Sequence, residues 1–152
     1  MFRLLRVILG GLFIGHGTQK LFGWFGGHGP EGTGQFFESL GLRPGGRNAT
    51  VAGVSEAAGG ALLATGLANP LAATAISGSM LTAIRHVHFA KGPWITDGGY
   101  EYNLVILAAV AAITAEEDGV GWALAALAAG AAGSAIATEL GKRESAAEPS
   151  GV

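Results

Sequence analysis

The sequence predicts an all-α protein, a polytopic membrane four-helix bundle with an additional C-terminal helix rich in Ala and Gly. Only 13% of the 152 residues are charged, against roughly 25% in ordinary soluble domains. Between Val51 and Ile84 the only ionisable residue is Glu56, although a soluble helix needs a solvated face. The apolar residues form five stretches, each near the roughly 20 residues that a helix needs to cross a bilayer.

The first expected span covers about residues 2–25. Gly11 and Gly15 form a small-xxx-small pattern, which would let a neighbouring helix approach closely. The start has the basic and apolar regions of a signal peptide, but no small-residue cleavage site follows and further apolar stretches do. We therefore expect this segment to be retained, with Arg3 and Arg6 reaching the lipid headgroups.

The second and third expected spans cover about residues 48–68 and 70–90. Asn48 is a suitable N-cap for the second span, and Asn-Pro at 69–70 ends it sharply. Because the two spans follow each other so closely, they should form a tight antiparallel hairpin. The small residues near one face of the second span are Gly53, Ala57, Gly60 and Ala64.

The connection between the first two spans is rich in Gly and Pro and holds one apolar patch. Its residues, Phe36, Phe37 and Leu40, can share a helical face at the membrane interface. Two interpretations stay open for this patch. It is either a surface helix that only joins two spans or a lid over the open end of the bundle.

The fourth expected span covers about residues 100–116, and a charged turn separates it from a fifth at about 120–140. The fifth segment is Ala/Gly-rich and only weakly hydrophobic. We expect it to cross the bilayer, and packing against the surface of the bundle is the alternative. Residues 1–141 thus form a single transmembrane helical domain, and the polar tail, residues 142–152, is expected to be disordered.

Polar residues of the expected spans gather at one end of the bundle, which we call face B. In an antiparallel bundle the ends of the first and third spans lie beside the starts of the second and fourth. An ionised group at the bilayer centre costs about 2.5–3.5 kcal/mol, so such groups usually face a protein interior or a wet cavity and pair with one another. The candidate ligand-binding residues at face B are His16, Gln19, Lys20, Glu56, His86 and Glu101.

Glu56 is the most informative of these residues. It lies about eight residues, roughly 12 Å, from the start of its helix, which is too deep for a short side chain to reach bulk water. Lys20, His16 or Arg85 could supply the positive charge that it needs. The pair would either hold the helices in register or bind a ligand or handle protons.

The face B histidines have several interpretations. His16 and Lys20, four residues apart, could bind an anionic or quinone-like oxygen, although a lone intramembrane histidine is often a packing residue. His86 and His88 point about 200 degrees apart on a helix, so a metal ion would need a ligand from another segment. We expect no metal site, and nothing in the sequence selects a haem held by His16 and His86.

The stretches RVILGGLFIGHGTQKLFGWFGGHG, AGVSEAAGGALLATG, Met80 to His88 and GYEYNL look like the DoxX family of bacterial membrane proteins. The resemblance covers about residues 3–115. It implies a four-helix integral membrane fold linked to quinone-coupled sulfur oxidation and to oxidative-stress and thiol homeostasis. GVGWALA replaces the GxGxxSLD-like ending of the family, which leaves the last segment's arrangement open. The positions that the resemblance carries over are Arg3, Gly15, His16, Lys20, Gly53, Glu56, Gly60, His86 and Glu101.

Charge and composition narrow the functional classes. The net charge of -2 at pH 7 gives no basic stripe for phosphates, so nucleic acid is not an expected partner. The chain has no cysteine, which excludes thiol relays and thiolate metal sites. It also has no motif for binding a nucleotide or redox cofactor, so catalysis by this chain alone is not expected.

The expected protein is therefore a multi-pass cell-membrane subunit of a redox or oxidative-stress system. Its expected partners are the lipid bilayer, a quinone or similar small molecule bound at face B, and redox enzymes. The alternatives are a membrane scaffold for soluble redox enzymes and a small-solute transporter.

Overall fold

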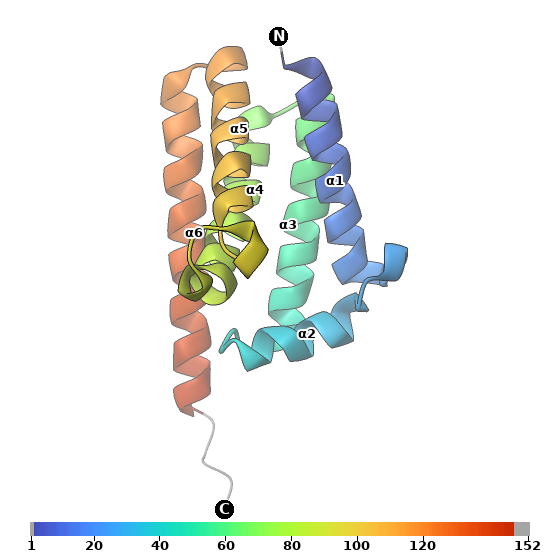
Figure 1. The fold of residues 1–152 in the computed structure, drawn as a ribbon, viewed down its shortest axis with the longest axis vertical. Helices are drawn as coiled ribbons and strands as arrows, with labels where there is room; N and C mark the ends of the chain where they lie inside the picture. Colours follow the sequence, from blue (N-terminus) through green and yellow to red (C-terminus); the bar gives the residue numbers. More distant parts are fainter. Residues whose placement is uncertain (1, 148–152) are drawn as a thin grey trace, which may run out of the picture.

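The computed structural model of the chain describes residues 2–147, and every regular element in this range is helical (Figure 1). The all-α fold class is therefore confirmed. The α-helices are α1 (Arg3–Phe22), α2 (Gly29–Ser39), α3 (Gly45–Thr65), α4 (Asn69–Ala83), α5 (Glu101–Glu117) and α6 (Val120–Ala147). The shorter helical turns are η1 (Trp24–Gly26), η2 (Ile84–His88), η3 (Phe89–Lys91) and η4 (Ile95–Asp97).

The helices form two groups (Figure 1). In the N-terminal group, α1 packs along α3, and α2 lies across the start of α3. In the C-terminal group, α4 packs along α6, and α5 packs on both. The hairpin of α3 and α4 joins the two groups. Its turn uses Gly66 as a left-handed C-cap (φ +72°), where a glycine avoids the strain that a side chain would add.

Glycines explain how closely α1 approaches α3. A Cβ atom added to Gly10 or Gly17 would lie 2.4–2.5 Å from backbone atoms of α3, whereas one added to Gly11 or Gly15 would meet nothing within 4 Å. The prediction that a neighbouring helix approaches α1 at Gly11 and Gly15 was therefore wrong. The predicted face of α3 is the one that α1 contacts, and its residues are Gly53, Ala57, Gly60 and Ala64.

The main hydrophobic cluster lies in one half of the bundle. Its largest fully buried side chains lie toward the end opposite face B, which we call face A. These residues come late in α3 and α5 and in the first half of α4, and they include Leu63, Ile76, Val110 and Ile113. The face B half therefore has fewer large side chains between the two groups.

The outside of the bundle is unusually apolar. Large apolar side chains are exposed on each of the five long helices, such as Leu4 (72%), Leu71 (64%), Val105 (64%) and Leu124 (62%), and extended apolar surface marks contact with a membrane or a partner. Within the described part of the chain, α6 is the one helix whose length and composition alone suffice to cross a membrane. The number of crossings stays a prediction.

The last helix is longer than expected. Residues 142–147, which we expected to be disordered, continue α6 to its end at Ala147. An ion pair between Arg47 of α3 and Glu144 (2.9 Å) holds this part of the helix against the N-terminal group. The rest of the expected disordered tail, residues 148–152, lies outside the described residues.

Candidate functional site

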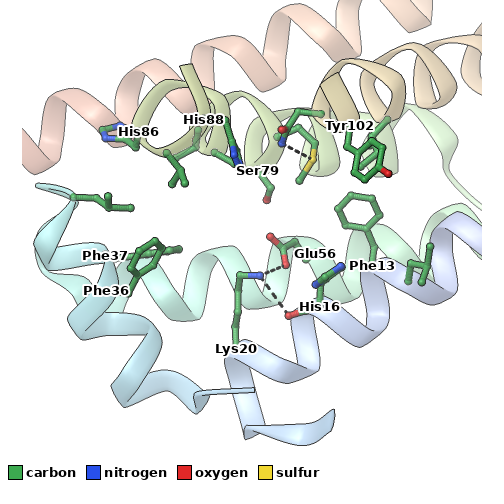
Figure 2. Close-up of a pocket in the computed structure, with 18 of the residues that line it drawn as sticks. Phe13, His16, Lys20, Phe36, Phe37, Glu56, Ser79, His86, His88 and Tyr102 are labelled. Atoms are coloured by element: carbon green, nitrogen blue, oxygen red, sulfur yellow. Dashed lines mark hydrogen bonds and ion pairs between the residues drawn. The ribbon is translucent and has the colours of Figure 1, made fainter. Parts of the chain in front are cut away.

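A cavity of about 440 Å³ lies between the two groups of helices in the face B half. Its volume falls within the range of about 300–1,000 Å³ that is typical of small-molecule sites. Figure 2 shows Lys20, Glu56 and His16 on the N-terminal side, opposite His86, His88 and Tyr102 on the C-terminal side. Most of the wall between these polar groups is apolar, and includes Leu9, Phe13, Phe37, Met80 and Ile106.

An ion pair between α1 and α3 forms one wall of this cavity. Glu56 is only 5% exposed, and its Oε2 accepts a hydrogen bond of 2.6 Å from Lys20 Nζ. The structure thus selects Lys20 from the partners that we considered. Gly53, one turn before Glu56 on α3, lets α1 approach here, because a Cβ atom added to it would lie 2.7 Å from the Leu21 side chain and 3.2 Å from the Lys20 Cβ.

The ammonium group of Lys20 has unused hydrogen-bonding capacity. Among residues 2–147, the second hydrogen bond of Nζ besides its bond to Glu56 is a long one of 3.5 Å to the backbone oxygen of His16. An ammonium carries three N–H donors. Lys20 lines this cavity and also a smaller hollow beside α2, so a molecule in either space could accept a bond from the remaining donor.

Gln19 orients His16 at the edge of the cavity. The Gln19 Nε2 donates to the backbone oxygen of Phe25 (3.4 Å), so its Oε1 faces His16 and accepts from the imidazole Nδ1 (3.1 Å). Because Nδ1 carries a proton, Nε2 is the ring nitrogen of His16 that remains for a ligand. Gln19 itself does not line the main cavity. It lines a smaller hollow of about 290 Å³ beside α2.

The two histidines of η2 both line the cavity but have different partners. His86 shares a hydrogen bond of 2.9 Å between Nε2 and Thr138 Oγ1 of α6, and His88 donates from Nδ1 to the backbone oxygen of Gly98 (2.7 Å). Our candidate set included His86 but missed His88. The chain is π-helical here, a rare geometry often found at functional sites that no local sequence pattern indicated.

Glu101 lies outside the lining of the cavity, so the structure does not bring it together with the expected ligand-binding residues that line it. Its Oε1 accepts from the backbone N–H of Ile95 (2.9 Å), and its own N–H donates to the oxygen of Pro93. The residue therefore fixes the loop before α5. The next two residues, Tyr102 and Asn103, line the cavity instead.

No metal-binding cluster is present in the described range. Among residues 2–147, no three His, Cys, Asp or Glu side chains lie close enough together to hold an ion. The carboxylate of Glu56 is committed to Lys20, and each of the cavity histidines uses one ring nitrogen in a hydrogen bond within the protein.

The polar groups at face A form a separate cluster, away from the cavity. Arg6, which we expected at the lipid headgroups, forms an ion pair with Glu117 of α5. Asn69 at the start of α4 donates to both Glu117 (2.8 Å) and Asp118 (3.0 Å). The cluster therefore joins the face A ends of three helices.

Comparisons with known proteins agree with the resemblance seen in the sequence. The sequence pattern of the DoxX family matches residues 2–89. The Bacillus subtilis (strain 168) protein named "Putative oxidoreductase CatD" is 34% identical over 111 residues, which are 73% of this chain and 76% of that protein. No solved structure matches the chain. The family match contains His16, Lys20, Glu56, His86 and His88, whereas α6 lies outside it.

Proposed function

This chain belongs to the DoxX family, and we propose that it is a multi-pass membrane subunit of a redox or oxidative-stress system that binds a quinone-like molecule in the face B cavity. The observation that carries the proposal is the Lys20–Glu56 pair, which presents a free N–H donor to a largely apolar cavity. The printed name of the Bacillus subtilis relative, "Putative oxidoreductase CatD", supports the redox part.

A quinone ring suits this cavity chemically. Its faces are apolar, and its carbonyl oxygens accept hydrogen bonds, so a charged donor such as Lys20 would bind one oxygen strongly. His88 lies on the opposite wall and could face the other end of the ring. Reduction of such a ring takes up electrons and protons in equal number. In the proposal a redox-enzyme partner supplies two electrons and water supplies two protons, which together convert the quinone to a quinol. The Lys20 ammonium stabilises the negative charge that develops on the oxygen between these transfers.

The apolar patch of α2 belongs to this site rather than to a free docking surface. Phe36, Phe37 and Leu40 all line the cavity, and Phe36 is 49% exposed. This placement supports the interpretation of α2 as a cover over the open end. It gives less support to a scaffold that would use the same side chains to hold soluble enzymes.

A binding measurement tests the proposal. Purified protein in detergent is titrated with a benzoquinone, and quenching of tryptophan fluorescence reports binding. We expect K20M to weaken binding by roughly 10- to 100-fold, because a hydrogen bond to a charged group contributes about 1.5–3 kcal/mol. K142M, which removes an exposed lysine outside the cavity, should bind as the original protein does.

Two outcomes would contradict the proposal. One is the absence of saturable quinone binding by protein that retains its far-ultraviolet circular dichroism. The other is unchanged affinity in K20M. If K20M is poorly folded, the double variant K20M/E56Q, which removes both charges, provides the same test without an unpaired carboxylate.

A further inference from the structure

The cavity opens on the side of the bundle. Residues that both line the cavity and are exposed mark its opening. On the N-terminal side the opening is bordered by α1 and α2, and on the C-terminal side by η4 and α5. These residues are Leu12 (58% exposed), His16, Phe36 (49%), Ile95 (37%) and Tyr102 (60%).

The packing of the helices explains this opening. Along the bundle α1 packs on α3, while α5 packs on α4 and α6, so the cavity reaches the surface between α1 and α5. At face A the pair of Arg6 and Glu117 joins these two helices and closes the gap. The surface on either side is apolar, since Ile8 on α1 is 52% exposed and Val105 on α5 is 64% exposed. In a membrane this opening would face the acyl chains.

Polarity changes from the inner end of the cavity to its opening. The inner end holds the buried polar groups, among them Glu56 (5% exposed) and Asn103 (7% exposed). The opening is mostly apolar, with Leu12, Phe36, Ile95 and the ring of Tyr102, and His16 is the polar side chain at its edge. A ligand that satisfies both ends has a hydrogen-bonding head placed inward and an apolar portion placed outward.

The cavity is too small for the whole of such a ligand. Its volume of about 440 Å³ is in the lower part of the usual range of about 300–1,000 Å³. A substituted ring and a few carbon atoms fit, but a long chain would have to leave through the opening.

We infer that the ligand is an amphiphile with a long apolar tail, which enters sideways from the bilayer between α1 and α5 and leaves its tail across Leu12 and Tyr102. The identity of the head as a quinone-like ring rests on the proposed function. The inference adds the tail, the route and the residues at the opening.

A comparison of two ligands and two tryptophan variants tests this inference. Both ligands have the same fully substituted benzoquinone ring, which carries either a decyl chain or a methyl group. Their binding is measured in phosphatidylcholine vesicles that contain the full-length protein. L12W narrows the opening, and the matched control I8W adds the same side chain one turn earlier on α1, at an exposed residue that does not line the cavity.

We expect L12W to weaken binding of the decyl ligand at least about tenfold and that of the methyl ligand by less than about threefold, while I8W changes neither. For each ligand, the affinity of a variant is divided by that of the original protein. The different partitioning of the two ligands into lipid therefore cancels. Because phosphatidylcholine is in large excess, saturable binding of the decyl ligand also separates a quinone site from a site for bulk lipid. L12F, a smaller change, should give an intermediate loss.

The outcomes separate the two proposals. Equal effects of L12W on both ligands, or no effect on either, would overturn lateral entry. The proposed function would still stand if K20M weakened binding of the methyl ligand at least about tenfold. If neither ligand binds the original protein saturably, the proposed function fails and this inference fails with it.

Discussion

The pairs of Lys20 and Arg6 join α1 to other helices at opposite ends of the bundle, and of these two pairs that of Lys20 lines a cavity. Lys20 pairs with Glu56 of α3 at face B, and Arg6 pairs with Glu117 of α5 at face A. The first pair leaves an ammonium donor facing open space. In the second, Asn69 shares the carboxylate of Glu117. A buried charge therefore indicates a binding site only when part of its hydrogen-bonding capacity faces a space that a ligand can fill.

The largest expected effect on stability comes from separating Lys20 from Glu56. K20M leaves a carboxylate that is 5% exposed without its cation, and loss of one partner of a buried pair costs about 3–5 kcal/mol. The double variant K20M/E56Q should recover most of this loss, because neither charge remains. Unfolding in a titration with denaturing detergent, followed by circular dichroism, measures the difference.

One result would contradict the explanation that K20M is unstable because of an unpaired charge. If K20M/E56Q is as unstable as K20M, the loss comes from changed packing around residue 20 and not from the unpaired charge. The Lys20–Glu56 and Arg6–Glu117 pairs would then contribute more similar amounts to the free energy of unfolding than their surroundings suggest.

The face A pair should affect stability but not binding. E117Q keeps a hydrogen-bond acceptor near Arg6 and Asn69 but removes the charge, so we expect a loss of about 1.5–3 kcal/mol, the usual contribution of hydrogen bonds to charged groups. Quinone affinity should stay within about twofold. E139Q is a suitable control because its exposed pair with Arg143 should contribute less than about 1 kcal/mol. A large loss of quinone affinity in E117Q would mean that face A controls the site.

Much of the fold could be predicted because it depends on local signals. The apolar stretches and the Asn-Pro break indicated the long helices and the hairpin of α3 and α4. Burial of a short carboxylate required a cation, and Lys20 was among the few available. The rotation of α1 about its own axis was not predictable in this way. Successive residues of a helix point about 100° apart, so the contact could use Gly10 and Gly17 instead of the small-xxx-small pair.

The parts that could not be predicted depend on contacts between distant segments. Arg6 and Glu117 are separated by 111 residues, and each alone looked like an interfacial charge. Glu101 could have pointed into the bundle, but the loop before α5 uses its carboxylate to bind a backbone N–H. His88 lines the cavity where α4 passes into a π-helical turn. No sequence pattern within a few residues of these positions indicates the contacts that they make.

The smallest predicted effect is a difference in stability between two glycine variants, which depends on how closely Gly66 packs against Arg6 in the face A cluster. Gly66 and Gly41 both have left-handed backbones (φ +72° and +77°), so alanine at either position should cost about 1–2 kcal/mol. At Gly66 the new Cβ would also lie 2.2 Å from the Arg6 guanidinium, whereas at Gly41 it would meet nothing within 4 Å. G66A should therefore be less stable than G41A, because Arg6 has to move away from Glu117.

The same pair of substitutions in the E117Q background shows whether that excess comes from the ion pair. Once Glu117 is neutral, displacement of Arg6 breaks a weaker interaction, so the difference between G66A and G41A should shrink. Detergent unfolding of the four variants measures this coupling. An excess that stays the same in both backgrounds would mean that Gly66 is needed for steric room in the turn alone. Face A would then be held together by packing, and Lys20–Glu56 would be the only one of the two pairs whose charge matters.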